Sequence, residues 1–349
     1  MARFVDISSD PESPVLIDAE AVTAVQIFPQ KDGVGETIHI SGAQGRIFLC
    51  EDNHGKNGWN IDADGLCDKL KGAGKSLVSL PSRAEDGTVN AEAFIDPAAV
   101  NFVTTSSASV SGQGGCGIIV GLPGVWRLER YDATAEDRDG LIAAVKSAKP
   151  DMISFKPHEA RARWFDAKDL LIDPAAITRI KEAADMLYVS FDRDQLDVNI
   201  GLEHNDRSEA ASNIANDLLQ KEEEAGVRRN LNDIFREAKA LVATSEKMRR
   251  RIVAERIAQT NPDLVDVPGA VDVTYVQPDD IAYIQAMDPE KQRQHKFGLF
   301  LVFKNKGRED RFDTEHIYFE TDDARQQGLA ALNRPRSTAP APQTCPPSP

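Results

Sequence analysis

The stretch FIDPAAVNFV at residues 94–103 decides the fold, because it returns as LIDPAAITRI at residues 171–180. Weaker copies are LIDAEAVTAV at residues 16–25 and YVQPDDIAYI at residues 275–284. The second residue of each copy, which we call the anchor, is apolar, and further apolar residues follow it by five and by eight positions. This recurrence predicts one structural module that occurs four times along the chain. The anchors are Ile17, Ile95, Ile172 and Val276.

The centre of the motif predicts a turn between two strands. Pro97 and Pro174 have a φ fixed at about −65° and no N–H group, which suits a turn and excludes a central strand. Asp96 and Asp173 precede them, and short polar side chains of this kind bond the backbone ahead. The alternative is the start of a helix, with Asp as N-cap and Pro at the first helical position. A single helical turn followed by a strand satisfies both interpretations, and we expect that structure.

Downstream of each anchor, apolar and polar residues alternate on both sides of a turn, which predicts a β-hairpin with one buried face. A short helix is then expected to close each copy. Residues 134–148 begin with a capping-box pattern of Thr134 and Asp137, and residues 208–220 and 321–332 have similar apolar faces. Each copy is thus expected to hold four or five antiparallel strands and one helix. The four predicted hairpins lie at residues 37–52, 117–131, 187–202 and 297–312.

The fourth anchor follows the third by 104 residues, whereas the earlier anchors are 78 and 77 residues apart. The surplus predicts an inserted helix, whose apolar residues step by four and three as in a heptad seam. The same part of the chain is basic, because residues 225–256 hold nine Lys or Arg against four Asp or Glu, a net charge of +5. The predicted seam consists of Val227, Leu231, Ile234, Ala238, Leu241, Ser245, Met248 and Ile252.

We therefore predict an α+β fold, a tandem array of four small antiparallel β-sheet modules, each closed by one helix, with a long basic helix inserted. A Pro-rich tail without an apolar period ends the sequence, and we expect it to be disordered. The predicted bounds are residues 1–75, 76–150, 151–223 and 263–333 for the modules, 224–262 for the basic heptad helix and 334–349 for the tail.

The net charge of −15 predicts a surface that repels nucleic acid and anionic membranes over most of its area. No stretch reaches the roughly 18 unbroken apolar residues of a membrane helix. The first residues lack the apolar core of a secretory signal. The four cysteines share no Cys-x-x-Cys spacing, which argues against a zinc knuckle, a redox pair or a disulfide framework. We expect a cytoplasmic protein without a membrane partner.

Three short stretches match ligand motifs only in part. GQGGCG at residues 112–117 fits the dinucleotide fingerprint but precedes an expected strand, where that fingerprint requires a helix. GAGKS at residues 72–76 follows an expected helix, and Lys69 stands where a P-loop needs its first Gly. NIDADG at residues 60–65 begins like a calcium loop, but its twelfth position is Lys71. The six histidines show neither metal-ligand spacing nor a catalytic pattern. We assign no catalytic, cofactor-binding or metal-binding residue and no small-molecule substrate.

The single unit, with its apolar strand, its I-D-P-A-A turn, its hairpin and its closing helix, resembles the short β-rich FlbD-type proteins of flagellar operons. The resemblance rests on residues 94–103 and 171–180 with their downstream hairpins, so it covers one module at a time. Those proteins are single short units without a basic helix. The resemblance implies a small β-rich unit, and it implies no catalytic residue.

The basic helix is the candidate partner-binding element. We predict a structural or protein–protein interaction protein, not an enzyme, that docks on a protein partner or self-associates through this helix. The alternative is a nucleic-acid-associated protein that binds phosphates along the helix. A basic face that is solvated, on a helix lying against the chain's own acidic modules, would explain the charges without a partner. The predicted partner-binding residues are Arg228, Arg229, Arg236, Lys239, Lys247, Arg249, Arg250 and Arg251.

Overall fold

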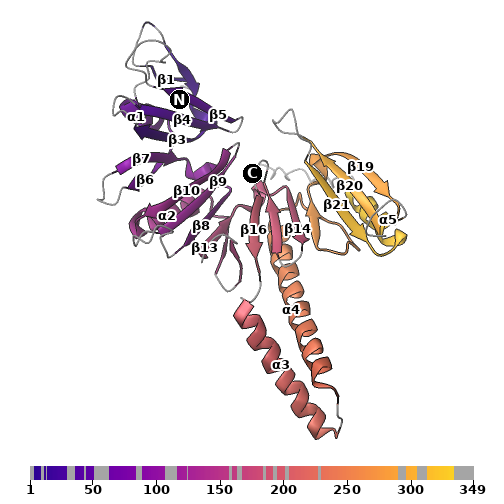
Figure 1. The fold of residues 1–349 in the computed structure, drawn as a ribbon. Coiled ribbons are helices and arrows are strands. Elements are labelled where there is room, and N and C mark those ends of the chain that lie inside the picture. Colours follow the sequence, from indigo (N-terminus) through magenta and orange to yellow (C-terminus); the bar gives the residue numbers. More distant parts are fainter. Residues whose placement is uncertain are drawn as a thin grey trace, which may run out of the picture.

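The computed structural model shows a mixed α+β protein, whose described residues form five α-helices and several small antiparallel sheets (Figure 1). The sheets follow one another across the molecule in chain order, and two long helices, α3 (His204–Glu224) and α4 (Leu231–Thr260), project from its middle (Figure 1). The predicted α+β class is confirmed. The structure describes residues 4–8, 12, 14–29, 36–42, 45–50, 63–83, 89–106, 116–123, 125–156, 159–162, 167–183, 186–191, 195–200, 204–226, 229–289, 296–304 and 313–333.

Sheet I combines two parts of the chain that α1 (Ala63–Gly72) separates. Its strand order is β5-β4-β3-β7-β6, in which the first three strands form a meander and the last two form a later hairpin. The hairpin joins the meander where β7 pairs antiparallel with β3. The strands are β3 (Val22–Pro29), β4 (Glu36–Gly42), β5 (Gly45–Cys50), β6 (Val78–Arg83) and β7 (Val89–Ile95).

Sheet II is built in the same way. Its order is β10-β9-β8-β13-β11, so a meander is followed by a hairpin that comes after α2 (Ala135–Ala148). The two parts join where β13 pairs antiparallel with β8. The strands are β8 (Phe102–Ser106), β9 (Cys116–Leu122), β10 (Val125–Ala133), β11 (Ile153–Phe155) and β13 (Ala167–Ile172).

Sheet III has the order β12-β16-β15-β14-β18-β17, and its hairpin comes after α3 and α4. Here β18 pairs with β14, and β12 adds outside β16. Sheet IV is a meander alone, β19-β20-β21, which α5 (Asp322–Leu332) follows. The strands are β12 (Arg161–Ala162), β14 (Arg179–Ala183), β15 (Met186–Ser190), β16 (Gln195–Asn199), β17 (Val265–Asp266), β18 (Thr274–Val276), β19 (Ile281–Met287), β20 (Phe297–Phe303) and β21 (Thr314–Phe319).

A two-stranded sheet of β1 (Phe4–Asp6) and β2 (Leu16–Asp18) precedes sheet I. The Asp6 carboxylate organises this hairpin, because it accepts hydrogen bonds from the Ser8 N–H at 2.9 Å, the Ser8 hydroxyl at 2.7 Å and the Val15 N–H at 3.1 Å. These bonds lower the pKa of Asp6. The hairpin thus depends on a carboxylate that favours its ionised form.

One register joins each later hairpin to the meander before it. In sheets I to III the anchor pairs with the residue seven positions after the preceding anchor. The residue after the anchor donates its N–H to the carbonyl of the meander residue just before the one that faces the anchor, at 2.8 to 3.0 Å. The pairs are Ile95 with Ala24, Ile172 with Phe102 and Val276 with Arg179.

A 3₁₀ helix follows each anchor strand, as the motif predicted. Asp96 and Asp173 cap two of these turns by accepting the N–H of the residue two positions on, and a Pro occupies the first helical position. Each Asp also pairs with a lysine from the segment after the preceding helix: Lys75 lies 2.6 Å from Asp96, and Lys149 lies 2.5 Å from Asp173. The turns are Ala19–Ala21, Pro97–Ala99, Pro174–Ala176 and Pro278–Asp280.

The sheets and helices enclose four main apolar clusters, which we call cores 1 to 4 in chain order. Their α-helices supply buried residues spaced by three or four positions, as expected of an amphipathic helix. The predicted capping box of Thr134 and Asp137 is confirmed at the start of α2. Representative buried residues are Ile38, Leu66 and Leu70 for core 1, Ile118, Leu141 and Val145 for core 2, Leu187, Val253 and Ile257 for core 3, and Leu299, Phe319 and Leu332 for core 4.

In sheets I to III, the later hairpin places a side chain in the core of the preceding meander, and the meander places one in the core that follows. The residue before the anchor enters the core of the preceding meander: Phe94 packs on core 1, Leu171 lies in core 2 and Tyr275 in core 3. In return, the meander residue that faces the anchor reaches the following core. Ala24 lies in core 2 and Phe102 in core 3, and the Arg179 guanidinium lies 4.8 Å from the centre of the core 4 ring of Phe303.

The helix that covers core 3 differs from the prediction. We expected residues 208–220 to close the third copy, but Ala215 in α3 packs with Ile234 and Ala238 of α4. The last turns of α4 instead supply Val253 and Ile257 to core 3. The chain returns to the sheets only at the end of α4, so its final apolar residues are the ones beside core 3.

Candidate functional site

Helix α4 is the candidate site, because it carries the basic residues and the seam that the sequence singled out. Asn230 caps its start by accepting the Asn232 N–H at 2.9 Å. At its end, the Asn261 side-chain amide donates to the carbonyls of Pro174 at 2.7 Å and Ile177 at 3.1 Å. The helix is therefore tied to the turn of sheet III at one end and projects with α3 at the other (Figure 1).

A buried ion pair locks the base of α4 to sheet III. The Arg250 guanidinium lies 2.6 Å from the Glu182 carboxylate of β14, and the two residues are 5% and 2% exposed. The same carboxylate lies 3.5 Å from the Val273 N–H. The positive charge of Arg250 is thus neutralised by Glu182 within the molecule.

Part of the predicted seam is exposed. Ile234 and Ala238 are buried against α3, while Val227 lies outside the described residues. A line of exposed apolar side chains continues along the helix, and we call it the α4 stripe. It consists of Leu241, Met248 and Ile252, which are 45%, 63% and 57% exposed.

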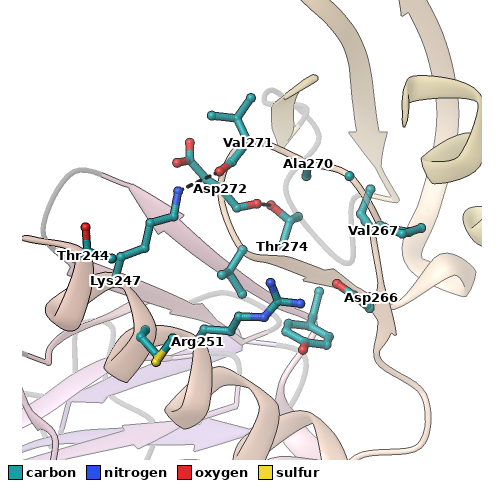
Figure 2. A pocket seen from close by; sticks show the side chains of 14 residues that line it. Thr244, Lys247, Arg251, Asp266, Val267, Ala270, Val271, Asp272 and Thr274 are labelled. Carbon is teal, nitrogen blue, oxygen red and sulfur yellow. Dashed lines mark hydrogen bonds between the residues drawn. The ribbon is translucent and has the colours of Figure 1, made fainter. Parts of the chain in front are cut away.

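A hollow of about 470 Å³ opens beside the α4 stripe, between α4 and residues 266–275. Met248 lines it together with Lys247 and Arg251. Figure 2 shows Arg251 pointing from α4 toward Asp266, and Lys247 reaching the Val271 carbonyl, to which it donates a hydrogen bond at 3.0 Å. None of the ligand motifs or predicted partner-binding residues pointed to residues 266–275, because a hollow between a helix and a distant loop leaves no local sequence pattern.

Titratable groups that line the hollow have raised pKa values. Burial, together with the neighbouring Asp266, raises the pKa of the Tyr275 hydroxyl to about 12, so this group stays protonated at neutral pH. Burial and the nearby Glu182 raise the pKa of Asp272.

Most of the predicted basic residues are occupied by partners on the same chain. Arg229 pairs with Glu222 and with Glu237, Arg236 lies 3.2 Å from Asp233, and Arg251 lies 2.9 Å from Glu255. Arg228 lies outside the described residues. Within the described part of α4, the side chains of Lys239 and Arg249 are exposed and form neither an ion pair nor a hydrogen bond.

The partial ligand motifs have structural roles where they can be described. Lys75 of GAGKS forms the Asp96 ion pair, and Gly74 takes a φ of 96° in the turn after α1. In GQGGCG, Cys116 and Gly117 begin β9, and the preceding residues lie outside the described part. The first three residues of NIDADG also lie outside it, and its last three, residues 63–65, begin α1. Among the described residues, no group of three or more His, Cys, Asp or Glu could hold a metal ion.

Comparisons with known proteins assign no family. Neither a protein-family model nor a curated protein matches the sequence. Within the described residues, no helix combines the length and apolar character needed to cross a membrane.

Proposed function

We propose that the protein is a non-enzymatic structural protein, a tandem array of four related β modules that binds a protein partner through α4. The observation that carries the proposal is the shared construction of sheets I to III, where each hairpin completes the sheet of the preceding meander in the same register. Such an array offers extended surfaces instead of one deep cleft. Each module would then comprise a hairpin, a 3₁₀ turn, a meander and a helix, with the α3–α4 pair inserted in the third.

The α4 stripe supports the docking role of the inserted helices. Leu241, Met248 and Ile252 are apolar, exposed and aligned, and exposed apolar surface of this kind is used in protein contacts. Arg249 lies next to Met248 without an ion pair of its own, so it favours an acidic flank on the partner. The hollow beside Met248 offers room for a partner side chain. The partner we propose is a protein segment with an apolar face and acidic flanks.

The ion pairs weigh against nucleic-acid binding. A phosphate-binding helix needs several free cations, because each neutralised phosphate releases counterions and adds to the affinity. Arg229, Arg236, Arg250 and Arg251 each pair with a carboxylate. These four of the nine cations in this stretch are therefore engaged, and two of their partners, Glu222 and Glu182, lie outside the stretch and offset part of its +5 charge.

Site-specific photocrosslinking in the native cells tests the proposal. A photoreactive residue at Met248 should give a discrete protein adduct, whereas one at exposed Asn216 on α3 should give none. Met248→Glu with Leu241→Lys should abolish an adduct formed from Ile252 while the thermal transition stays unchanged, because all three side chains are exposed. Adducts that a nuclease removes would support nucleic-acid binding instead, and no adduct at Met248 and Ile252 would contradict docking through α4.

A further inference from the structure

Two strands at opposite ends of the array have open edges. Within the described residues, β2 pairs only with β1, and β19 pairs only with β20. The strands in the matching positions of the array pair on both sides: β7, β13 and β18 each join a preceding meander, and β3, β8 and β14 each accept a following hairpin. The β1–β2 hairpin therefore has the form of a donor, and β19 has the form of an acceptor.

The register of the three internal joints fixes how these edges would meet. In each joint the anchor faces the residue seven positions after the preceding anchor. Applied to the last meander and the first hairpin, this rule pairs Tyr283 in β19 with Ile17 in β2. It also places Leu16 opposite Ile284. Nothing else is needed to define the alignment of the two strands.

Side-chain exposure singles out the same positions. At the internal joints the residues before the anchor, Phe94, Leu171 and Tyr275, pack in the preceding core, but Leu16 in the first hairpin is 62% exposed. Residues that face the anchor reach the following core, but Tyr283 is 52% exposed.

The outer strand of each hairpin repeats the pattern. In β6, β11 and β17 one residue faces the anchor. The residues that come directly before it in the chain are Leu77, Met152 and Leu264, and each packs on the preceding core. Its counterpart in β1 is Phe4, which is 56% exposed. Among the described residues, the large exposed apolar side chains outside α4 are Phe4, Leu16 and Tyr283.

We propose that the β1–β2 hairpin of one copy adds to β19 of a second copy, so that the protein associates end to end. Leu16 and Phe4 of the first copy would enter core 4 of the second, and Tyr283 of the second copy would enter core 1 of the first. Strand addition of this kind satisfies the open backbone edge and buries the exposed side chains in one step. The contact joins two different surfaces, so it extends into open chains, or into a ring where the rotation between copies closes. The proposal goes beyond docking through α4, because it uses neither α3 nor α4.

Charge sets the conditions for the experiment. Both ends carry carboxylates close to the proposed contact, Asp18 and Glu20 on the donor and Asp279 and Asp280 on the acceptor. Like charges oppose the contact, and salt screens them, so association should strengthen as ionic strength rises. Binding through a basic surface would show the opposite dependence.

Sedimentation velocity of the full chain, run in about 0.5 M salt where the Debye length falls to a few ångströms, is the test. We expect the unmodified protein to form species at multiples of its 38.2 kDa mass as its concentration rises. Leu16→Glu and Tyr283→Glu should each weaken association about thirtyfold or more, as removal of a central interface residue does. Both residues are exposed, so the thermal transitions of the variants should match that of the unmodified protein.

Mixing the two variants gives the decisive readout. The Leu16→Glu chain keeps an intact acceptor strand, and the Tyr283→Glu chain keeps an intact donor hairpin. Each alone should be monomeric, but the equimolar mixture should form a two-chain species and stop there, because both remaining ends are blocked. A symmetric interface cannot give this result.

Met248→Glu, a matched change of an exposed apolar residue on α4, separates the two proposals. It should leave end-to-end association unchanged, and it should abolish docking through the α4 stripe. Loss of association in this variant, or a mixture that stays monomeric, would overturn the end-to-end contact. Monomers at every concentration would also overturn it.

Discussion

Gly121 in β9 permits the tight packing between cores 2 and 3. It pairs with Phe102 across the strands, and a Cβ atom at this position would lie 2.1 Å from the Phe102 ring atom Cε1. The ring is fully buried and lies 5.3 Å from that of Phe191, centre to centre, so it has little freedom to move. The absence of a side chain at residue 121 is therefore a packing requirement.

Gly121→Ala should lower the free energy of unfolding by about 1–3 kcal/mol, because an added methyl group overpacks a filled core. Equilibrium denaturation with urea measures the change. Gly140→Ala is the matched control, because nothing lies within 4 Å of the added atom in α2, and it should raise stability by up to about 1 kcal/mol. Equal effects of the two substitutions would contradict this account of Gly121.

Asp272→Asn should stabilise the protein at neutral pH and have little effect near pH 4. Burial raises the pKa of Asp272, so the folded state holds its proton more tightly than the unfolded chain does. The stability that this site contributes is therefore lost as the pH rises above the pKa of Asp272 in the unfolded chain and through its raised pKa in the folded state. The gain should be no more than about 0.5 kcal/mol, since solvent screens a half-exposed carboxylate. Denaturation at both pH values checks it, and an equal effect of Asp272→Asn at the two pH values would contradict it.

Residue-scale predictions from the sequence succeeded where the partner is close along the chain. The Asp caps and the Pro residues of the 3₁₀ turns act within a few residues of the chain, so the local sequence motif alone indicated them. The Lys75–Asp96 and Lys149–Asp173 pairs span 21 and 24 residues. No local pattern predicts such a partner, and Lys75 was instead weighed as part of an incomplete phosphate loop.

At the scale of the elements, α4 shows what apolar periodicity can and cannot predict. The spacing of its apolar residues correctly predicted a long helix, because each turn presents the same face. It did not predict that Ile234 and Ala238 would pack on α3 while Met248 and Ile252 stay exposed. A seam indicates that a face is apolar, and the surrounding chain decides what covers it.

Arg250→Met should lower the free energy of unfolding by about 3–5 kcal/mol, because it leaves the Glu182 carboxylate buried without its partner. Denaturation of the double variant Arg250→Met, Glu182→Leu should recover much of that loss, since no buried charge is then left unpaired. Arg249→Met, one position away and exposed, should change stability by no more than about 0.5 kcal/mol. A small effect of Arg250→Met would show that the ion pair does not hold α4 to sheet III.

The arrangement of the whole molecule depends on contacts that local patterns do not specify. The alternation of apolar and polar residues predicted the hairpins, but it did not identify which meander each leading hairpin joins. One signal was present, because residues 94–95, 171–172 and 275–276 each place two apolar residues in succession. A strand with one buried face needs only alternate apolar residues, so adjacent ones indicate burial on both faces. In the structure these pairs enter two different cores.

The exchange of side chains should couple the stability of neighbouring sheets. Leu171 is 1% exposed in core 2, while the adjacent Ile172 lies in core 3, so both cores depend on the placement of β13. Leu171→Ala should cost about 2–5 kcal/mol. Amide hydrogen exchange should then rise in β8 and β9 of sheet II and also in β14 and β15 of sheet III, because loosening β13 exposes both sides. Leu332→Ala in α5, a change of similar size in core 4, should raise exchange in sheet IV while leaving sheets I and II unchanged. If Leu171→Ala affects sheet II alone, the sheets unfold independently and the joints do not transmit stability from one sheet to the next.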